Sequence, residues 1–318
     1  MPGIVGMGTT FNLPNYVGEL FQASPSDTPL LSAIGGLTGG EQTDQKEFEW
    51  QTFDLRDPSI PSHLEGQDAP EGQARVRQNV RNVVQIFHET VELSYTKIAA
   101  TGQRDGLPGN NPVTNEMDWQ VMQAIKQIAR DVEYTFINGV YSNPTDNSAP
   151  RKTRGILSAI TTNVITMDDG SGGPAPLSEE AVLDLLQSVW ENGGIQEQET
   201  ATIIVNGTQK RKLTEIFITN KNYQEQSRNI AGVNVQTIET DFGRLNVMLN
   251  RYMPPDQLAV VSLEQLRPRF LLIPGKGHFF EEPLAKTGAS EKVQIYGEIG
   301  LEYGWEGAHG KIVNLTVS

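Results

Sequence analysis

The chain has 318 residues and a usual share of apolar side chains, so it can bury a sizeable core and global disorder is not expected. Its formal net charge of −14 disfavours strong direct binding to nucleic acid, which requires a basic footprint. No cysteine is present, which excludes disulfides and thiolate metal sites; no apolar run is long enough to span a membrane, and the N-terminus lacks the pattern of a signal peptide, so we expect a cytosolic origin.

The first 40 residues show little periodicity and contain helix-breaking prolines. They also carry a dense group of large apolar side chains, namely Phe11, Leu13, Tyr16, Val17, Leu20 and Phe21. A frayed terminus does not need such side chains. We therefore predict an extended arm, with Phe11 and Tyr16 as candidate contacts to other subunits.

Two extended segments of opposite charge follow. Residues 41–57 are mainly acidic, whereas residues 75–82 contain arginines and no acid. The stretch between them, 58–72, has turn-forming residues and no hydrophobic anchor. The pattern predicts a long two-stranded arm with one acidic and one basic leg.

An isolated two-stranded hairpin is only marginally stable in water, so we expect this arm to lie on a neighbouring subunit. Arg75, Arg77 and Arg81 alternate on one face and would meet acids on the neighbour or on the opposite leg. Phe48 and Trp50 would supply the apolar anchor. An ordinary surface hairpin with solvated charges is the alternative.

The strongest helix signal covers 115–138, with Asn115 as the N-terminal cap and Gly139 as the stop. The predicted buried stripe consists of Val121, Ile125, Ile128, Val132 and Phe136. A helix of this length can form the backbone of an elongated subunit.

A small mixed α+β region is predicted beyond this helix. A second helix begins at Ser178, and a buried strand at 201–205 leads into a helix at 208–217. Further strands are expected at 87–95, 233–240, 245–250, 258–263, 270–273, 292–296, 300–305 and 311–317.

No complete catalytic or metal-binding constellation is found. The run from Asp169 to Pro174 is similar to a trypsin-like protease motif, but two residues are exchanged and no matching histidine exists. The segment from His88 to Glu92 begins like a zinc-protease helix, yet it ends in Glu and alternates as a strand. We expect no catalytic residues, no metal and no cofactor.

Several segments together resemble the major capsid proteins of tailed bacteriophages. They are Phe11-Asn12-Leu13-Pro14-Asn15-Tyr16, Thr28-Pro29-Leu30-Leu31-Ser32, Glu47-Phe48-Glu49-Trp50, Phe279-Phe280-Glu281-Glu282-Pro283-Leu284 and Tyr296-Gly297-Glu298-Ile299-Gly300-Leu301. The resemblance covers nearly the whole chain and is weakest at 160–250. These motifs are structural and assign no chemistry.

The resemblance implies the α+β capsid fold of tailed phages, with the parts in chain order. These are an N-terminal arm (1–40), an extended β-hairpin loop (41–92), a peripheral domain with the long spine helix (93–158), an axial domain (159–265) and C-terminal strands that return to the peripheral domain (266–318).

The function that the resemblance implies is structural: self-assembly of hexamers and pentamers into an icosahedral head shell around double-stranded DNA. The shell would be assembled in the host cytoplasm and become part of the virion. A separate scaffold protein and a portal are the implied partners, and decoration proteins and covalent cross-links stay open. A cellular nanocompartment shell of the same fold is the first alternative, and a hydrolase that uses unrecognised acids is the second.

Overall fold

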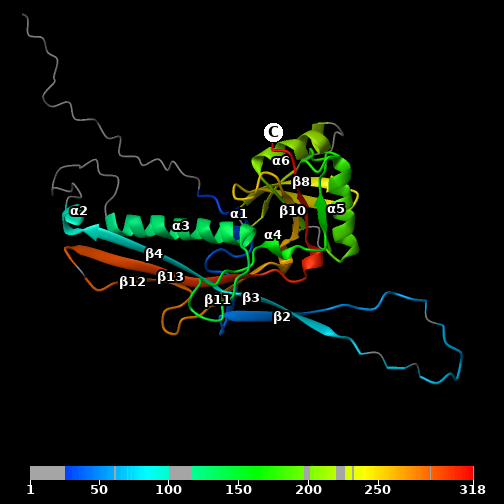
Figure 1. Ribbon diagram of the computed structural model, residues 1–318, viewed down its shortest axis with the longest axis horizontal. Coiled ribbons are helices and arrows are strands. Elements are labelled where there is room, and N and C mark those ends of the chain that lie inside the picture. The colour runs from blue at the N-terminus through cyan, green and yellow to red at the C-terminus, as the bar shows by residue number, and fades with distance from the viewer. Residues whose placement is uncertain are drawn as a thin grey trace, which may run out of the picture. The chain divides into compact units, whose positions relative to one another are not determined.

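The computed structural model describes residues 26–60, 62–69, 71–72, 74–99, 116–196, 201–219, 226–230, 233–286 and 288–317 (Figure 1). The candidate arm residues Phe11 and Tyr16 and the predicted cap Asn115 lie outside these ranges. The chain divides into two compact units. One contains Glu89–Gln127 and Glu281–Ile295, and the other contains Asp27–His88, Ile128–Phe280 and Tyr296–Ser318.

A seven-stranded mixed sheet lies in the second unit. Its order is β5 (Val164–Thr166), β14 (Gly310–Val313), β10 (Leu258–Ser262), β6 (Ala201–Val205), β9 (Gly243–Leu249), β8 (Val233–Thr240) and β7 (Gln226–Ile230). The β5–β14 and β6–β9 pairs are parallel and the others antiparallel. The central strands β6 and β10 are buried at every position, which explains their unbroken apolar runs.

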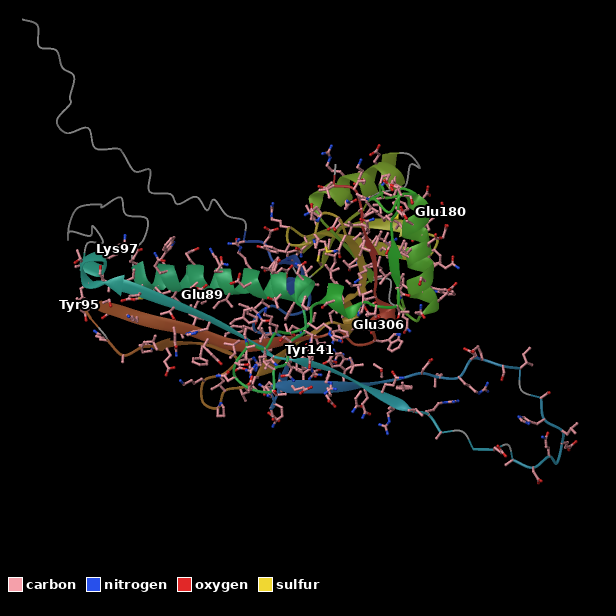
Figure 2. The ribbon with its side chains drawn as sticks, in the orientation of Figure 1. Glu89, Tyr95, Lys97, Tyr141, Glu180 and Glu306 are labelled. Atoms are coloured by element: carbon pink, nitrogen blue, oxygen red, sulfur yellow. The ribbon has the colours of Figure 1, made fainter. Side chains whose placement is uncertain are left out.

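Helix α5 (Glu179–Glu191) packs against β5 and β14 and closes this core. Ser178 caps the helix by accepting a hydrogen bond from the N–H of Ala181 at 3.2 Å, as the sequence predicts. The apolar side chains Val182, Leu185, Leu186 and Val189 are fully buried. Glu180 is exposed on the outer side of the helix (Figure 2).

Helix α6 (Gly207–Thr214) follows β6 directly and is capped by Asn206, whose side chain accepts from the N–H of Thr208. The sequence predicts one continuous helix to 217. In the structure, α6 passes into a π-helical turn, η1 (Glu215–Thr219), which buries Phe217.

A second sheet has five strands. Its order is β1 (Glu41–Thr43), β11 (Arg267–Leu271), β13 (Ser290–Glu302) and β12 (Phe279–Pro283), with β4 (Gln85–Ser94) also paired to β13. β1 runs parallel to β11. The two strands predicted at 292–296 and 300–305 are one strand, β13, because residues 297–299 between them continue in extended backbone, and this strand ends at Glu302.

The long helix is α3 (Glu116–Asn138), about 34 Å long at 1.5 Å per residue. Val121, Ile128, Val132 and Phe136 are buried as predicted, but Ile125 is 42% exposed, so its assignment to the buried stripe is wrong. The buried face turns around the helix axis, since Ala124 is buried in the first half of the helix and Ile137 near its C-terminal end.

The remaining elements are short. They are α1 (Pro29–Ala33), the strands β2 (Glu47–Phe53) and β3 (Arg77–Val83), α2 (Tyr95–Ala99), α4 (Ile156–Ala159), and the 3₁₀ turns η2 (Leu263–Gln265) and η3 (Glu306–Ala308). No helix within the described ranges is long and apolar enough to cross a membrane.

Candidate subunit-contact site

The predicted hairpin is formed by β2 and β3, which pair antiparallel from Glu47–Val83 to Phe53–Arg77. Its two legs carry opposite charge, as expected. The Nη1 of Arg81 lies 3.4 Å from the Oε1 of Glu47, and Arg77 donates to the Oε1 of Gln51 at 3.0 Å. These contacts are exposed, so each contributes at most about 1 kcal/mol to stability.

The base of the hairpin is anchored on its own chain by its two aromatic residues, and their contact with a neighbouring subunit stays a prediction. Phe48 is buried, and the indole of Trp50 donates to the carbonyl of Gly304 at 2.7 Å and meets the ring of Tyr303 edge-on at 4.9 Å. Gly300 leaves room for Phe48, because a Cβ there would lie 2.7 Å from its Cε1. These two side chains hold the hairpin to its own subunit.

Asn82 is the polar centre of this anchor and is fully buried. Its amide donates to the carbonyls of Leu301, at 2.7 Å, and Arg154, at 3.1 Å. Its oxygen accepts from the N–H groups of Arg154 and Val83. All of its hydrogen-bonding capacity is used, so it fixes where the hairpin leaves the fold.

The segment that joins the two strands, residues 54–76, contains no strand in its described part; we call it the hairpin tip (Figure 1). It exposes four large apolar side chains, Leu55, Ile60, Leu64 and Val76, and Ile60 is 98% exposed. Arg75 is also exposed here, just before β3 begins. Covering one such apolar side chain fully is worth about 1.5–3 kcal/mol, so the tip favours contact with a partner.

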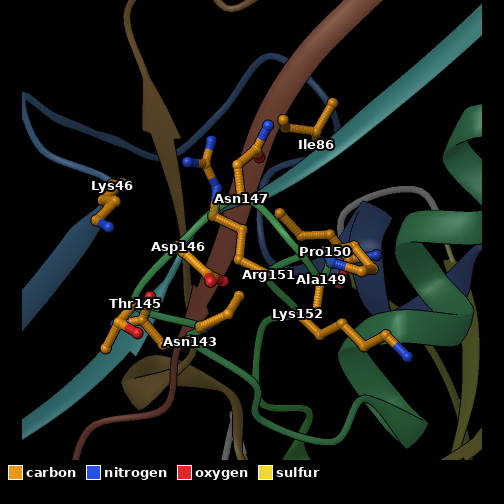
Figure 3. Close-up of a pocket in the computed structure, with 12 residues that line it drawn as sticks. Lys46, Ile86, Asn143, Thr145, Asp146, Asn147, Ala149, Pro150, Arg151 and Lys152 are labelled. Atoms are coloured by element: carbon orange, nitrogen blue, oxygen red, sulfur yellow. The ribbon is translucent and has the colours of Figure 1, made fainter.

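A pocket of about 550 Å³ lies beside the hairpin base (Figure 3). Lys46, Gln85 and Ile86 line it together with residues of the loop 143–152. Asp146 closes this loop by accepting from the side chain and N–H of Ser148, which lowers its pKa.

Arg151 holds the pocket loop to the sheets. Its guanidinium donates to the carbonyl of Val84 at 2.9 Å and forms an ion pair with Glu298. Glu298 is buried and also accepts from the hydroxyl of Tyr296 at 2.7 Å. The loop is therefore held in place at one end by a partly buried ion pair.

A buried carboxylate, Glu133 of α3, joins three distant segments. Its oxygens accept from the N–H of Leu30 at 2.9 Å, the N–H of Leu31 at 2.6 Å and the side-chain amide of Asn250 at 2.5 Å. Burial raises the pKa of Glu133 to about 7. Through these hydrogen bonds, Glu133 connects α3 to α1 and to the residue that follows β9.

Neither chemical motif that the sequence analysis weighed forms a catalytic arrangement. Asp169 accepts from Ser171 and Gly173 within its own loop, and the His88–Glu92 segment belongs to strand β4. Among the described residues, no group of three or more His, Cys, Asp or Glu side chains could hold a metal ion.

Comparison with protein families and curated proteins gives two matches. The model of the family described as "SU10 major capsid protein" matches residues 3–316. The major capsid protein of Escherichia phage Phieco32 is 29% identical over 133 residues, which is 42% of this chain and 34% of that relative. The chain therefore matches about a third of the length of this curated relative.

Solved structures share the fold at low sequence identity. The cyanophage A-1(L) capsid matches with a TM-score of 0.67 and 11% identity over 98% of this chain and 99% of that one. The capsid of the native GTA particle matches with a TM-score of 0.61 and 11% identity, and the match covers 98% of each chain. The SrpI encapsulin of Synechococcus elongatus PCC 7942 matches with a TM-score of 0.59 and 10% identity, over 88% of this chain and 86% of that one. The predicted α+β capsid fold is confirmed by these likenesses.

Proposed function

Because the chain belongs to the SU10 major capsid protein family, we propose that it assembles with copies of itself into a closed shell of hexamers and pentamers around phage double-stranded DNA. The family match over residues 3–316 supports this proposal. The structural observation that carries it is the hairpin tip, whose apolar side chains are not covered by the part of the chain that the structure describes. Repetition of one such contact around a ring is a direct route to a closed assembly.

The hairpin is the proposed arm between subunits, within an extended loop of residues 41–92. Arg75, Arg77 and Arg81, which we call the hairpin arginines, are exposed, and the contacts of Arg77 and Arg81 with the opposite leg are weak enough to be exchanged for acids of a neighbour. Charges of this kind set register and partner choice more than affinity. The N-terminal arm, with Phe11 and Tyr16, is proposed as a second contact segment.

The charge of the chain fits a container for DNA. A net charge of −14 means that a shell lining of this protein does not hold DNA tightly, so DNA can be driven in and released. A separate scaffold and a portal protein are the proposed partners during assembly in the host cytoplasm. We propose no catalytic activity and no cofactor, in keeping with a structural family.

A nanocompartment shell that encloses enzymes is the second candidate function. The likeness to the SrpI encapsulin favours it, because both shell types share this fold. Genes for a terminase and a portal beside this one favour the phage capsid, and a gene for a protein with a short cargo peptide favours the nanocompartment.

Negative-stain electron microscopy of the purified protein, alone and with its scaffold, tests the proposal. We expect closed shells of uniform size. Light scattering that shows only monomers under all conditions, including with the scaffold, overturns it. Elemental analysis of purified shells tests the absence of a cofactor, and a stoichiometric metal contradicts that part.

A further inference from the structure

We propose that the pocket beside the hairpin base receives the hairpin tip of a second copy of this chain. The inference rests on the proposed shell function and names the surface on which the arm lands. The pocket is that formed by Lys46, Gln85, Ile86 and the loop 143–152, and the tip is the segment 54–76.

The pocket offers positive charge that its own chain does not neutralise. Lys46 and Lys152 are exposed, lie on opposite sides of the hollow in Figure 3, and have no ion-pair partner within the part of the chain that the structure describes. Arg151 is paired with Glu298, and Asp146, which accepts hydrogen bonds from Ser148, adds one negative charge to the lining, so the two lysines leave an excess of positive charge. The two lysines therefore remain available to an acidic partner.

The pocket also offers an apolar wall. Ile86 is 45% exposed, and Pro144, Ala149 and Pro150 line the same hollow. A partner that combines carboxylates with aliphatic side chains fits both features. At about 550 Å³ the hollow has the size that proteins use for small ligands, so it accepts a short turn and not a folded domain.

The hairpin tip has this chemistry. Its residues 54–72 contain the carboxylates Asp54, Asp57, Glu65, Asp68 and Glu71 against one cation, Arg56. The guanidinium of Arg56 is already bound to Ser59 and to the carbonyl of Asp57. Leu55, Ile60 and Leu64 supply exposed aliphatic side chains between the acids.

One part of the tip is a preformed turn of suitable size. The N–H of Gln67 donates to the carbonyl of Leu64 at 3.1 Å, and the side chain of Gln67 accepts from the N–H of Leu64 at 3.1 Å. These two hydrogen bonds close the turn of residues 64–67. Leu64 and Glu65 lie at the exposed edge of this turn. A preformed turn loses little conformational entropy when it binds.

Charge reversal tests the pairing. We expect the pocket variant Lys46→Glu/Lys152→Glu and the tip variant Glu65→Lys/Asp68→Lys each to raise the protein concentration at which shells form by about tenfold, since two exposed attractions become repulsions. The variant that carries all four changes restores attraction and assembles like the wild type. Circular dichroism of the unassembled subunit checks that each variant is folded.

A matched control separates pairing from net charge. The pocket variant combined with Glu179→Lys/Glu180→Lys on α5 has the wild-type net charge but an unmatched pocket, and we expect it to stay impaired. If this control assembles as well as the four-change variant, or if neither single-site variant is impaired, the docking inference is wrong.

Cross-linking shows whether the contact joins two chains. The sequence has no cysteine, so Gln67→Cys in the tip and Asn147→Cys in the pocket provide the two thiols. A bis-maleimide should give covalent oligomers on a denaturing gel from shells, and Gln67→Cys paired with Gln187→Cys on α5 should not. Shells that form without oligomers, with both thiols modified, overturn the docking and leave the proposed function standing; a wild type that never forms shells overturns the proposed function itself.

Discussion

Replacing Glu133 with Gln removes a pH dependence that this buried carboxyl group adds to stability. Its side chain is fully buried, and burial raises its pKa from 4.5 to about 7 in the folded chain. The folded state therefore binds the proton more tightly than the unfolded state. The group stabilises the fold most below its unfolded pKa, and this contribution is lost as the pH rises from 4.5 through 7.

The size of the effect follows from the two pKa values. Between pH 8 and pH 5 this one group increases the free energy of unfolding by about 2.5 kcal/mol. Gln has the same shape and no titration, so the variant lacks this increment at every pH. Asp27 also raises the pKa of Glu133, but it is paired with Arg251 at 2.8 Å and its effect is the smallest of the causes.

Urea denaturation of the unassembled subunit at pH 5, 6, 7 and 8 measures the difference. We expect the gain in unfolding free energy from pH 8 to pH 5 to be smaller by about 2.5 kcal/mol in Glu133→Gln than in the wild type. Glu180→Gln, which removes an exposed carboxylate on α5, should follow the wild type. Parallel curves for Glu133→Gln and the wild type refute the assignment.

Three further predictions concern the hairpin anchor, a buried histidine and the arm. Gly300→Ala places a Cβ against the ring of Phe48 and should lower the free energy of unfolding by about 1–3 kcal/mol in thermal denaturation, whereas Gly288→Ala, with open space around it, should not. Burial lowers the pKa of His309 to about 4, so stability is lost as the pH falls from 6.5 towards 4, and its ring signals in NMR should show the neutral form at pH 5; a charged ring there contradicts this. Changing all three hairpin arginines to Glu should leave the subunit folded but impair shell formation in light scattering, and normal shells with wild-type heat stability contradict the charged-arm proposal.

The sequence predicted correctly those helices, strands and charge patterns that depend on neighbouring residues in the chain. The cap at Ser178, the buried strand at 201–205 and the opposed charges of the hairpin legs are all found, and the strand predicted at 258–263 is found at Leu258–Ser262. Each depends on residues within a few positions, so the sequence carries the signal.

What packs against an element is not visible in its local pattern. The stripe on α3 assigns Ile125 to the core, but its neighbours in space leave it exposed. The pattern that makes Phe48 and Trp50 candidate contacts between subunits does not show that Gly300 and Gly304 receive them within the chain. Neither glycine has a local pattern that marks it as a receptor.

The two buried polar anchors carried no signal in the sequence. Glu133 lies 102 and 117 residues from Leu31 and Asn250, its partners, and Asn82 lies 219 residues from Leu301. On a helix or strand such residues read as ordinary surface positions. No residue within a few positions of either one identifies a partner so far along the chain.

The distance between Asn82 and Leu301 also sets an order of events during synthesis. A ribosome adds on the order of 5–20 residues per second, so the hairpin emerges many seconds before the strand that fixes its base. Until β13 is complete, neither the hydrogen bond from Asn82 to Leu301 nor the space at Gly300 that receives Phe48 exists. The direction of the hairpin is therefore fixed only when synthesis of the subunit is nearly complete. A nascent chain lacks the fixed hairpin that would bind a neighbouring subunit too early.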